Sequence, residues 1–315
     1  MSQNQLPSRA QVGEAQQRLV ELVRRTPVIE VADASLLGSS GGEGSGRFVM
    51  KLEQLQYSGT FKARGASNYV ASMPISDAGV VAASGGNHGA AVAWAARRAG
   101  HAATIFVPTI SSPAKVERLR SYGADVRQVG AVYAESLEAS LLFQAETGAT
   151  SIHAYDHPVV MAGAGTTGAE FVEQAGGLDT ILVACGGGGL AGGIACAVDL
   201  DVAVVVCETV TTNAFAAAVA AGSPQDVEVG GLAADALGAT RIGELPWAAL
   251  AGHRAQSVLV TDEDLVEAQD HLWNEFRLIV EPSAATTVAA LRSGQYVPAS
   301  GERVGVLLCG ANTSR

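Results

Sequence analysis

The sequence predicts an α/β protein built on parallel-type twisted sheets flanked by helices. From residue 77 onward, short runs of apolar residues alternate with amphipathic segments of helical length. Such alternation is typical of strand–crossover–strand units, in which ligands bind at the carboxyl ends of the strands. Hydrophobic residues make up 48% of the chain and charged residues only 16%, as expected for a compact globule.

The N-terminal part of the chain predicts two helices and two strands. Apolar residues recur at helical spacing over residues 8–24, and Thr26-Pro27 ends this helix because proline restricts the residue before it. Residues 27–31 and 47–52 predict strands, with a flexible Gly/Ser loop at 39–46 between them. Residues 61–72 form the next helix, with Ser58 or Thr60 as its N-cap.

The remaining elements follow from the alternation itself. Strands are expected at residues 79–83, 102–107, 124–129, 150–153, 180–184, 203–208 and 303–308. Helices are expected at residues 89–100, 113–122, 132–147, 161–174, 189–199, 262–276 and 283–292. No internal repeat interrupts this order.

Composition excludes several classes of function. The 315 residues carry a formal net charge of −11 and no basic cluster, so nucleic acid is not the expected partner. No signal peptide is visible, and the apolar stretch 181–198 is broken by glycines, so we expect no membrane span. Four cysteines without metal-ligand spacing predict reduced thiols and a cytoplasmic protein.

Lys62 is the candidate catalytic residue. It is one of only three lysines among 20 basic residues, and it opens the helix 61–72 after a Ser-Gly-Thr turn. Beside Phe61 and near the positive end of a helix, its ammonium form would be disfavoured. A neutral amine can attack an aldehyde. The alternative for an isolated lysine is an ordinary surface position.

A run of four glycines is the candidate phosphate site. Gly186, Gly187, Gly188 and Gly189 follow the strand 180–184 and precede a helix that begins near Leu190. Glycines allow close approach and expose successive amides to a phosphate, helped by the helix N-terminus. The alternatives are a structural turn and the dinucleotide loop of an oxidoreductase. Four consecutive glycines fit a single phosphate better than the GxGxxG spacing does.

Two further segments follow predicted strands. Residues 84–88 lie between a strand and a helix, so their amides and side chains face the same sheet edge, although a helix entry capped by asparagine is an alternative. Cys309 follows the strand 303–308 and precedes Gly310-Ala311-Asn312. By itself it could be an inert buried thiol.

Taken in order, these motifs resemble those of the serine/threonine dehydratase family of pyridoxal-phosphate enzymes (fold type II), which includes serine racemase. The motifs are Ser-Gly-Thr-Phe-Lys-Ala-Arg-Gly around Lys62, Ser-Gly-Gly-Asn-His-Gly at 84–89, the glycine run and Cys-Gly-Ala-Asn at 309–312. The resemblance spans about residues 26–312. It implies two α/β domains: a large cofactor-binding domain (1–67 and 149–315) and an inserted substrate-gripping domain (68–148). The cofactor would lie in the cleft between them.

The resemblance also implies residue roles. Lys62 would hold pyridoxal phosphate and take the α proton of the substrate. The implied cofactor contacts are Phe61, Lys62, Asn87, Gly186, Gly187, Gly188, Gly189, Leu190 and Cys309. The implied substrate contacts are Ser84, Gly85, Gly86, Asn87 and His88. Asp235 and Glu281 align with cleft motifs and have structural roles as alternatives, whereas Arg64 is expected to hold the backbone.

A metal ion stays open at this point. Glu208 resembles one ligand of a metal site found in parts of the family, but Ala214 stands where the second acidic ligand aligns. A divalent ion prefers more carboxylate than that. A solvated or helix-capping carboxylate is therefore the alternative for Glu208.

The implied activity is elimination of water from L-threonine or L-serine, giving a 2-oxo acid and ammonia. The alternatives are a serine racemase, a 3-hydroxyaspartate dehydratase and, from another class, a nucleotide-binding oxidoreductase. Racemisation is expected to be slow or absent, because Gly85 aligns with the serine that supplies the second acid/base group in serine racemase. The resemblance alone implies a homodimer.

Overall fold

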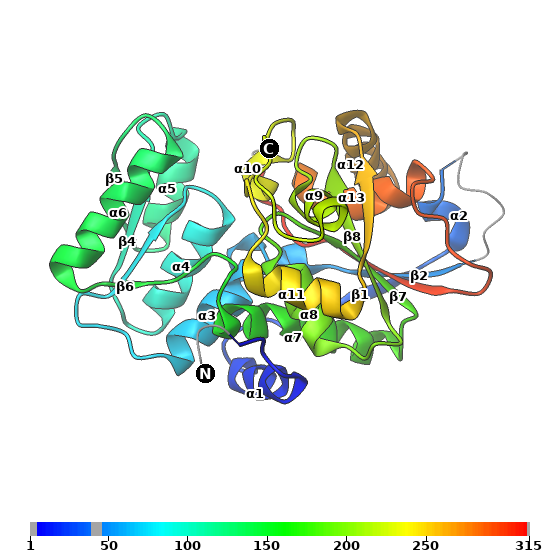
Figure 1. Cartoon of the computed structure of the whole chain (residues 1–315), viewed down its shortest axis with the longest axis horizontal. Coiled ribbons are helices and arrows are strands. Elements are labelled where there is room, and N and C mark those ends of the chain that lie inside the picture. The colour runs from blue at the N-terminus through cyan, green and yellow to red at the C-terminus, as the bar shows by residue number, and fades with distance from the viewer. Residues whose placement is uncertain (1–4, 39–45, 314–315) are drawn as a thin grey trace.

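The computed structural model describes residues 5–38 and 46–313, which form two sheets covered by helices (Figure 1). The larger sheet has the strand order β1-β2-β10-β7-β8-β9 and the smaller one β5-β4-β3-β6. Every neighbouring pair is parallel except β1 and β2. The predicted α/β class with parallel-type sheets is therefore confirmed.

The larger sheet combines both ends of the chain. Its strands are β1 (Val28–Val31), β2 (Arg47–Lys51), β10 (Arg303–Leu307), β7 (Thr180–Ala184), β8 (Ala203–Thr209) and β9 (Gln256–Val260). In Figure 1, α7 (Pro158–Ala175), α8 (Gly189–Ala197) and α11 (Glu244–His253) lie below it, and α12 (Asp262–Phe276) and α13 (Pro282–Arg292) lie above. The remaining helices of this part are α1 (Arg9–Leu19), α2 (Asp33–Leu36), α9 (Ala214–Ala221) and α10 (Ala234–Leu237).

The smaller sheet forms a separate lobe between α3 (Lys62–Ser72) and α7 in chain order. Its strands are β3 (Val80–Ala83), β4 (Ala103–Val107), β5 (Asp125–Gln128) and β6 (Thr150–Ser151), and its helices are α4 (Asn87–Arg98), α5 (Pro113–Ser121) and α6 (Tyr133–Thr147). Val80 and Ala82 belong to the core cluster shared with α3 and α4, whereas Val81 and Ala83 pack toward α6. The period-2 alternation of a strand thus buries both faces of this sheet.

The predicted boundaries at residues 68 and 148 stay a prediction. The last strand of the smaller sheet, β6, lies just beyond the second boundary, at Thr150–Ser151.

Helix α7 packs closely against α3 and α8 through backbone contacts. A Cβ added at Gly163 would lie 2.7 Å from the Arg64 carbonyl oxygen in α3, and one at Gly165 would lie 2.4 Å from the Gly193 oxygen in α8. Only glycine allows helices to approach this closely. The spacing between α3 and α8, which both begin at the candidate site, is therefore set by α7.

Most predicted bounds differ from the structure by one or two residues, and the larger differences are in the first helix and in the helix predicted at 161–174. The first helix ends at Leu19 instead of 24, and beyond it the Gln56 side chain hydrogen-bonds both the amide and the carbonyl of Arg24. The strand predicted at 150–153 is limited to Thr150–Ser151, and the helix predicted at 161–174 begins earlier, at Pro158. The loop predicted at 39–46 lies, except for Gly46, outside the described residues.

The segment between residues 208 and 262 contains four elements that the sequence did not predict: α9, α10, α11 and β9. Strand β9 is a half-exposed edge strand without clear alternation. Helix α11 carries Pro246 in its first turn, where a proline is tolerated because no intrahelical donor is needed there. No helix within residues 5–38 and 46–313 is long and apolar enough to span a bilayer.

Candidate active site

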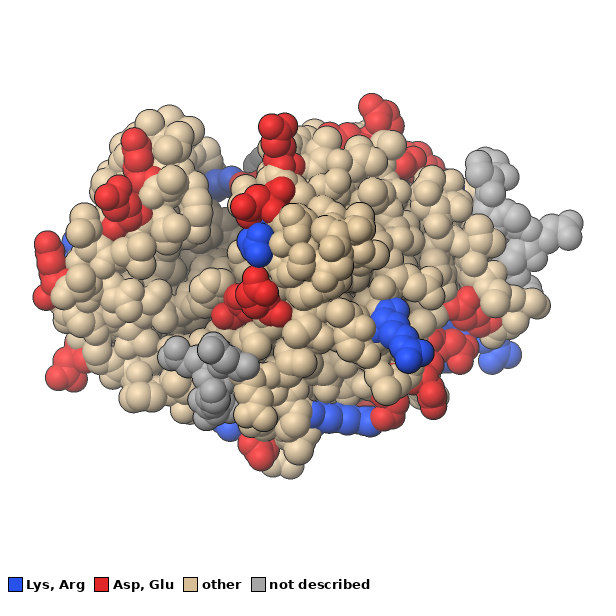
Figure 2. Space-filling view, in the orientation of Figure 1, with Lys and Arg blue, Asp and Glu red and all other residues tan. Residues whose placement is uncertain are grey.

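A cavity between the two lobes collects most of the predicted site residues. Figure 2 shows a hollow between the lobes. The sequence-predicted members of the cavity lining are Phe61, Lys62, Asn87, Gly186, Gly187, Gly188, Gly189, Leu190 and Cys309. Asn87 comes from the smaller lobe, and the others come from the carboxyl edge of the larger sheet and from the start of α3. Segments that are distant in sequence therefore meet at one place.

Lys62 is the first residue of α3, and its ammonium form is disfavoured. Its Nζ donates to the carbonyl oxygen of Ala154 at 2.7 Å and lies 5.1 Å from the centre of the Phe61 ring. Burial lowers the pKa of Lys62 to about 8, although the nearby Cys309 and Glu281 partly oppose this shift. The expected direction of the shift is confirmed, and burial is its main cause.

The turn before Lys62 is unusual. Helix α3 has no side-chain N-cap; Thr60 Oγ1 accepts a long hydrogen bond of 3.4 Å from the Lys62 amide, and Ser58 caps nothing. Ser58 itself has φ +56° and Gly59 has φ +67°. A left-handed conformation is costly for a serine and persists only where the surroundings hold it.

The glycine run joins β7 to α8. Gly188 has φ +88° at the N-cap of α8, so the amide end of this helix faces the cavity. A Cβ at Gly187 would lie 2.4 Å from the Tyr155 ring, one at Gly186 would lie 2.9 Å from Leu237 Cα, and one at Gly188 would lie 2.6 Å from Pro246. Packing therefore requires glycine at these three positions.

Asn87 is held by Glu281, a residue for which the sequence left a structural role open. Asn87 Nδ2 donates to both Glu281 carboxylate oxygens, at 2.9 and 3.0 Å. The same carboxylate accepts hydrogen bonds from Ser283 Oγ at 2.7 Å and from the Asn312 amide at 2.9 Å. Asn87 Oδ1 is buried without a partner among the described residues. Glu281 is 3% exposed and faces the cavity, so it belongs to the site.

The segment 84–88 lies at the end of β3, as predicted. The Gly86 amide donates to Ser84 Oγ at 3.3 Å, and a Cβ at Gly85 would lie 3.6 Å from Ser111 Oγ. The His88 side chain points away from this loop, because its Nε2 donates to the Ile152 carbonyl oxygen at 2.9 Å. Burial lowers the pKa of His88 to about 3, so the imidazole is neutral. It lines a second, enclosed cavity beside Lys62.

Cys309 follows β10 and lies against the segment that carries Lys62. The Cys309 carbonyl oxygen accepts from the Phe61 amide at 3.0 Å, and Thr60 forms a β-bridge with Gly310. Burial raises the pKa of the Cys309 thiol, so the thiol is neutral. All four cysteines are free.

Glu208 caps a helix. Its carboxylate accepts from the amides of Phe215 and Ala216, at 2.8 and 2.9 Å, at the start of α9. Burial raises the pKa of Glu208 to about 8, and the two amide hydrogen bonds partly oppose this. Across the described ranges, no three His, Cys, Asp or Glu side chains are grouped as metal ligands.

Arg64 holds carboxylates, which corrects the expectation that it mainly holds backbone. Its guanidinium contacts Glu53 at 2.6 Å and Glu170 at 3.0 Å, and Lys51 contacts Glu170 at 2.5 Å. All four residues are buried. Within the described part of the chain, one longer hydrogen bond, 3.4 Å to the Arg24 carbonyl oxygen, reaches the backbone.

Several cavity residues escaped the sequence reasoning. They are Tyr155, Ala184, Cys185, Ala236, Leu237 and Ser283. Tyr155 follows β6 closely, and Cys185 directly precedes the glycine run, so position after a strand was an available signal for both. Asp235, by contrast, ion-pairs with Lys115 at 2.5 Å and is half exposed.

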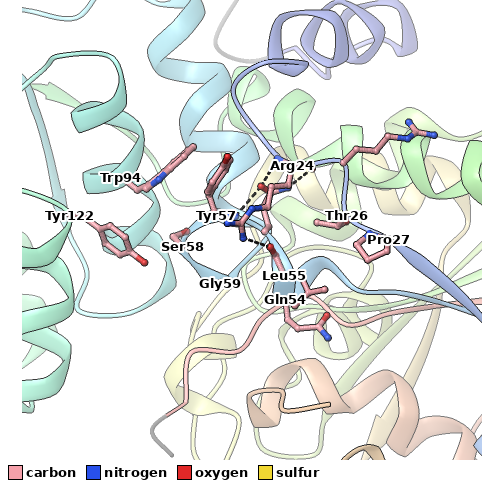
Figure 3. Close-up of a pocket in the computed structure, with 12 residues that line it drawn as sticks. Arg24, Thr26, Pro27, Gln54, Leu55, Tyr57, Ser58, Gly59, Trp94 and Tyr122 are labelled. Atoms are coloured by element: carbon pink, nitrogen blue, oxygen red, sulfur yellow. Dashed lines mark hydrogen bonds between the residues drawn. The ribbon is translucent and has the colours of Figure 1, made fainter. Parts of the chain in front are cut away.

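A larger open cavity lies on the other side of the Ser58–Gly59 turn (Figure 3). Arg24 stacks on Tyr57 at 4.3 Å, and Tyr57 stacks on Trp94 at 4.6 Å. Figure 3 shows Trp94 and Tyr122 facing this turn from the smaller lobe. Because its lining does not include Lys62 or the glycine run, we place the candidate active site in the smaller cavity.

Comparison with known proteins gives a consistent picture. A family model described as pyridoxal-phosphate dependent enzyme matches residues 19–310. Phenylserine dehydratase of Ralstonia pickettii is 34% identical over 319 residues, covering 98% of this chain and 94% of that protein. L-threonine ammonia-lyase of Thermotoga maritima is 33% identical over 306 residues, covering 96% of this chain and 74% of that protein. The solved structure of maize serine racemase has 30% sequence identity and a TM-score of 0.89, covering 98% of this chain and 95% of that chain. The chain therefore belongs to the pyridoxal-phosphate dependent enzymes of fold type II.

Proposed function

We propose that the protein eliminates water from a 3-hydroxy amino acid with an uncharged side chain, L-threonine or L-serine, and that the resulting enamine is hydrolysed to a 2-oxo acid and ammonia. The observation that carries this proposal is the Lys62 amine, whose pKa is lowered to about 8 in a cavity that also holds the glycine run and Asn87. The relatives that match over most of the chain include hydroxy amino acid dehydratases.

The cavity suits pyridoxal phosphate, the cofactor of the family. The amides of the glycine run would hold the phosphate, Lys62 the aldehyde carbon, Asn87 the ring oxygen and Cys309 the ring nitrogen. The buried Asn87 Oδ1, which has no partner among the described residues, is consistent with a site whose polar groups await a ligand. When bound, this cofactor withdraws electrons from the α carbon of the substrate.

The residues of the chain would then divide the work. Lys62, partly neutral near pH 8, takes the α proton, because a base acts best when its pKa lies near the working pH. The amides of residues 84–88 bind the substrate carboxylate at the start of α4. The neutral Cys309 thiol holds its proton and brings no positive charge to the ring. Burial of the cavity excludes water from the amine.

The lining favours an uncharged substrate side chain. A 3-hydroxyaspartate has a second carboxylate that needs a cation, yet Lys62 is the only Lys or Arg among the described residues that line the cavity. His88 is held neutral. Lys115 at the cleft edge is already paired with Asp235. We therefore expect 3-hydroxyaspartate to be a poorer substrate than serine or threonine.

Serine racemisation and nucleotide-dependent oxidoreduction are disfavoured for separate reasons. Serine racemisation needs an acid/base group on the second face, and Gly85 supplies none. Membership of the family favours pyridoxal-phosphate chemistry over a nucleotide-binding oxidoreductase. We also propose a cytoplasmic homodimer, on the resemblance and on the four free cysteines.

Two measurements test this proposal. Borohydride reduction of the cofactor-loaded protein, followed by peptide mapping, should label Lys62 and leave Lys51 and Lys115 unlabelled. Lys62→Ala should lose both the visible absorbance of the bound cofactor and all turnover. A panel of serine, threonine, phenylserine and 3-hydroxyaspartate, scored for 2-oxo acid release, then ranks the substrates. Turnover that survives in Lys62→Ala, or a label on another lysine, would contradict the proposal.

A further inference from the structure

Helix α5 of the smaller lobe reaches across the cleft to the larger one. Lys115 contacts Asp235, in α10 of the larger lobe, at 2.5 Å. One turn further along the same helix, Arg118 makes two hydrogen bonds to the larger lobe. Both of its partners belong to segments that also carry cavity residues.

The guanidinium of Arg118 joins these two segments. Its Nη2 donates to the Ser58 carbonyl oxygen at 2.5 Å, and its Nη1 donates to the side-chain oxygen of Asn312. Two N–H groups of one planar guanidinium thus fix two acceptors relative to each other. One acceptor lies four residues before Lys62, and the other lies three residues after Cys309.

The Ser58 acceptor lies in the strained turn. Ser58 and Gly59 are both left-handed, and Ser58 is not a glycine. The Ser58 hydroxyl is buried without a partner among the described residues, so its own side chain does not hold this conformation. The bond from Arg118 therefore contributes directly to keeping the Ser58 carbonyl oriented as it is.

The Ser58–Gly59 turn also sets the position of Lys62. The Ala311 amide donates to the Gly59 carbonyl oxygen at 2.9 Å, and the Phe61 amide donates to the Cys309 carbonyl oxygen at 3.0 Å. The segments 58–62 and 309–312 are thus paired, and Arg118 bonds to both of them. If the Ser58 carbonyl rotated, this pairing and the start of α3 would shift together.

We propose that Arg118 is a positioning residue for Lys62. It acts from the smaller lobe, through the Ser58–Gly59 turn, and fixes the position of the Lys62 amine relative to Cys309. Arg118 is not among the described residues that line the cavity, so it acts without touching cofactor or substrate. The turnover readout of this inference rests on the proposed function, whereas its backbone readout does not.

The first experiment compares Arg118→Ala with Arg120→Ala, which removes the same charge from an exposed position of the same helix. Amide hydrogen exchange is measured with and without pyridoxal phosphate. In Arg118→Ala, exchange at the Gly59, Phe61 and Ala311 amides should rise by about tenfold or more. In Arg120→Ala it should stay as in the wild type. Equal exchange at these three amides in both variants would overturn the proposal.

The second experiment separates the turn from general stability. Arg118→Ala should lower kcat about tenfold with little change in KM, because a small displacement of a reacting group is enough for such a loss. Arg118→Lys should recover part of kcat, since lysine can replace one of the two bonds. Ser58→Gly relieves the backbone strain, so the effect of Arg118→Ala in that background should shrink to about threefold or less.

The outcomes also distinguish this inference from the proposed function. A tenfold loss that persists unchanged in the Ser58→Gly background would show that Arg118 does not act through the turn. If Arg118→Ala fails to fold, the same test is made with Arg118→Lys. Its effect on kcat is measured once in the wild-type background and once in the Ser58→Gly background. Failure of the Lys62→Ala test would instead overturn the function while leaving the exchange result intact.

Discussion

The side-chain nitrogen of Asn87 donates to both carboxylate oxygens of Glu281, at 2.9 and 3.0 Å, in a buried pair that bridges the two lobes. A carboxylate accepts hydrogen bonds and donates none, so Glu281 decides which end of the Asn87 amide faces it. The remaining Nδ2 hydrogen stays available to an acceptor in the cavity. A glutamine in place of Glu281 could present either a donor or an acceptor to Asn87. The orientation of the Asn87 amide would then no longer be fixed by residue 281.

Glu281→Gln should therefore weaken pyridoxal phosphate binding by about tenfold, the cost of one hydrogen bond to a charged group. Equilibrium binding to the apoprotein, followed by absorbance, measures the change. Glu281→Asp is the matched control, because it keeps a group that only accepts. A glutamine variant that binds the cofactor as tightly as the wild type would contradict this account of Asn87.

The lowered pKa of Lys62 predicts how cofactor capture depends on pH. Only the neutral amine attacks an aldehyde, and the pKa of Lys62 is about 8. Below that pH the capture rate should rise about tenfold per unit, and above about pH 9 it should level off. Stopped-flow absorbance with the apoprotein measures the capture rate. The control is lysine acetylated at its α-amine, which keeps a free side-chain amine. A rise that continues as steeply above pH 9 would indicate an unshifted lysine.

The same shift affects the stability of the apoprotein. The folded pKa of Lys62 is about 8, and the ordinary value is 10.5, so between these values the unfolded chain binds more protons than the folded one. The free energy of unfolding should therefore rise with pH across that window by the contribution of this group. Denaturant titrations of wild type and Lys62→Met at pH 8 and 10 isolate it. An equal pH dependence in both would contradict the assignment.

Gly85→Ser tests why this chain should not racemise serine. A Cβ at Gly85 would lie 3.6 Å from its nearest neighbours, Ser111 Oγ and a Val107 methyl, which is ordinary van der Waals contact, so the position has room for a β-carbon. The serine hydroxyl would supply an acid/base group that the loop lacks. We expect D-serine formation from L-serine to appear, while wild type forms little or none. Chiral chromatography measures it, and rapid D-serine formation by wild type would refute the role given to Gly85.

The buried ionic cluster predicts a large effect on folding. Glu170→Ala removes the carboxylate that binds both Lys51 and Arg64, leaving buried positive charge unpaired. It should lower the free energy of unfolding by about 3 kcal/mol or more. Glu173→Ala is the control, because its pair with Arg25 is exposed and is worth less than about 1 kcal/mol. Similar denaturation midpoints for the two variants would contradict this.

The residues that the sequence singled out for the cofactor line one cavity for a physical reason, whereas Ser84, Gly85, Gly86 and His88 are not part of that lining. Lys62, Asn87, the glycine run and Cys309 all lie directly after strands or turns whose local signals are strong, and parallel strands end at a common edge. The roles of Arg64 and Arg118 could not be read in the same way. Their partners Glu53, Glu170, Ser58 and Asn312 are set by how segments distant in sequence pack together, and no local pattern records these contacts. The Ala-rich α9 and the half-exposed β9 lacked a periodic signal of their own.

The close packing of α7 has a consequence for distant substitutions. Gly163 and Gly165 touch the backbones of α3 and α8, so they determine how far apart the amine and the phosphate-binding amides lie. A single methyl group at either position would widen that separation without altering any residue that a ligand contacts. Weak cofactor retention in natural or engineered variants could thus originate at the back of the molecule, at sites that an inspection of the pocket alone would pass over.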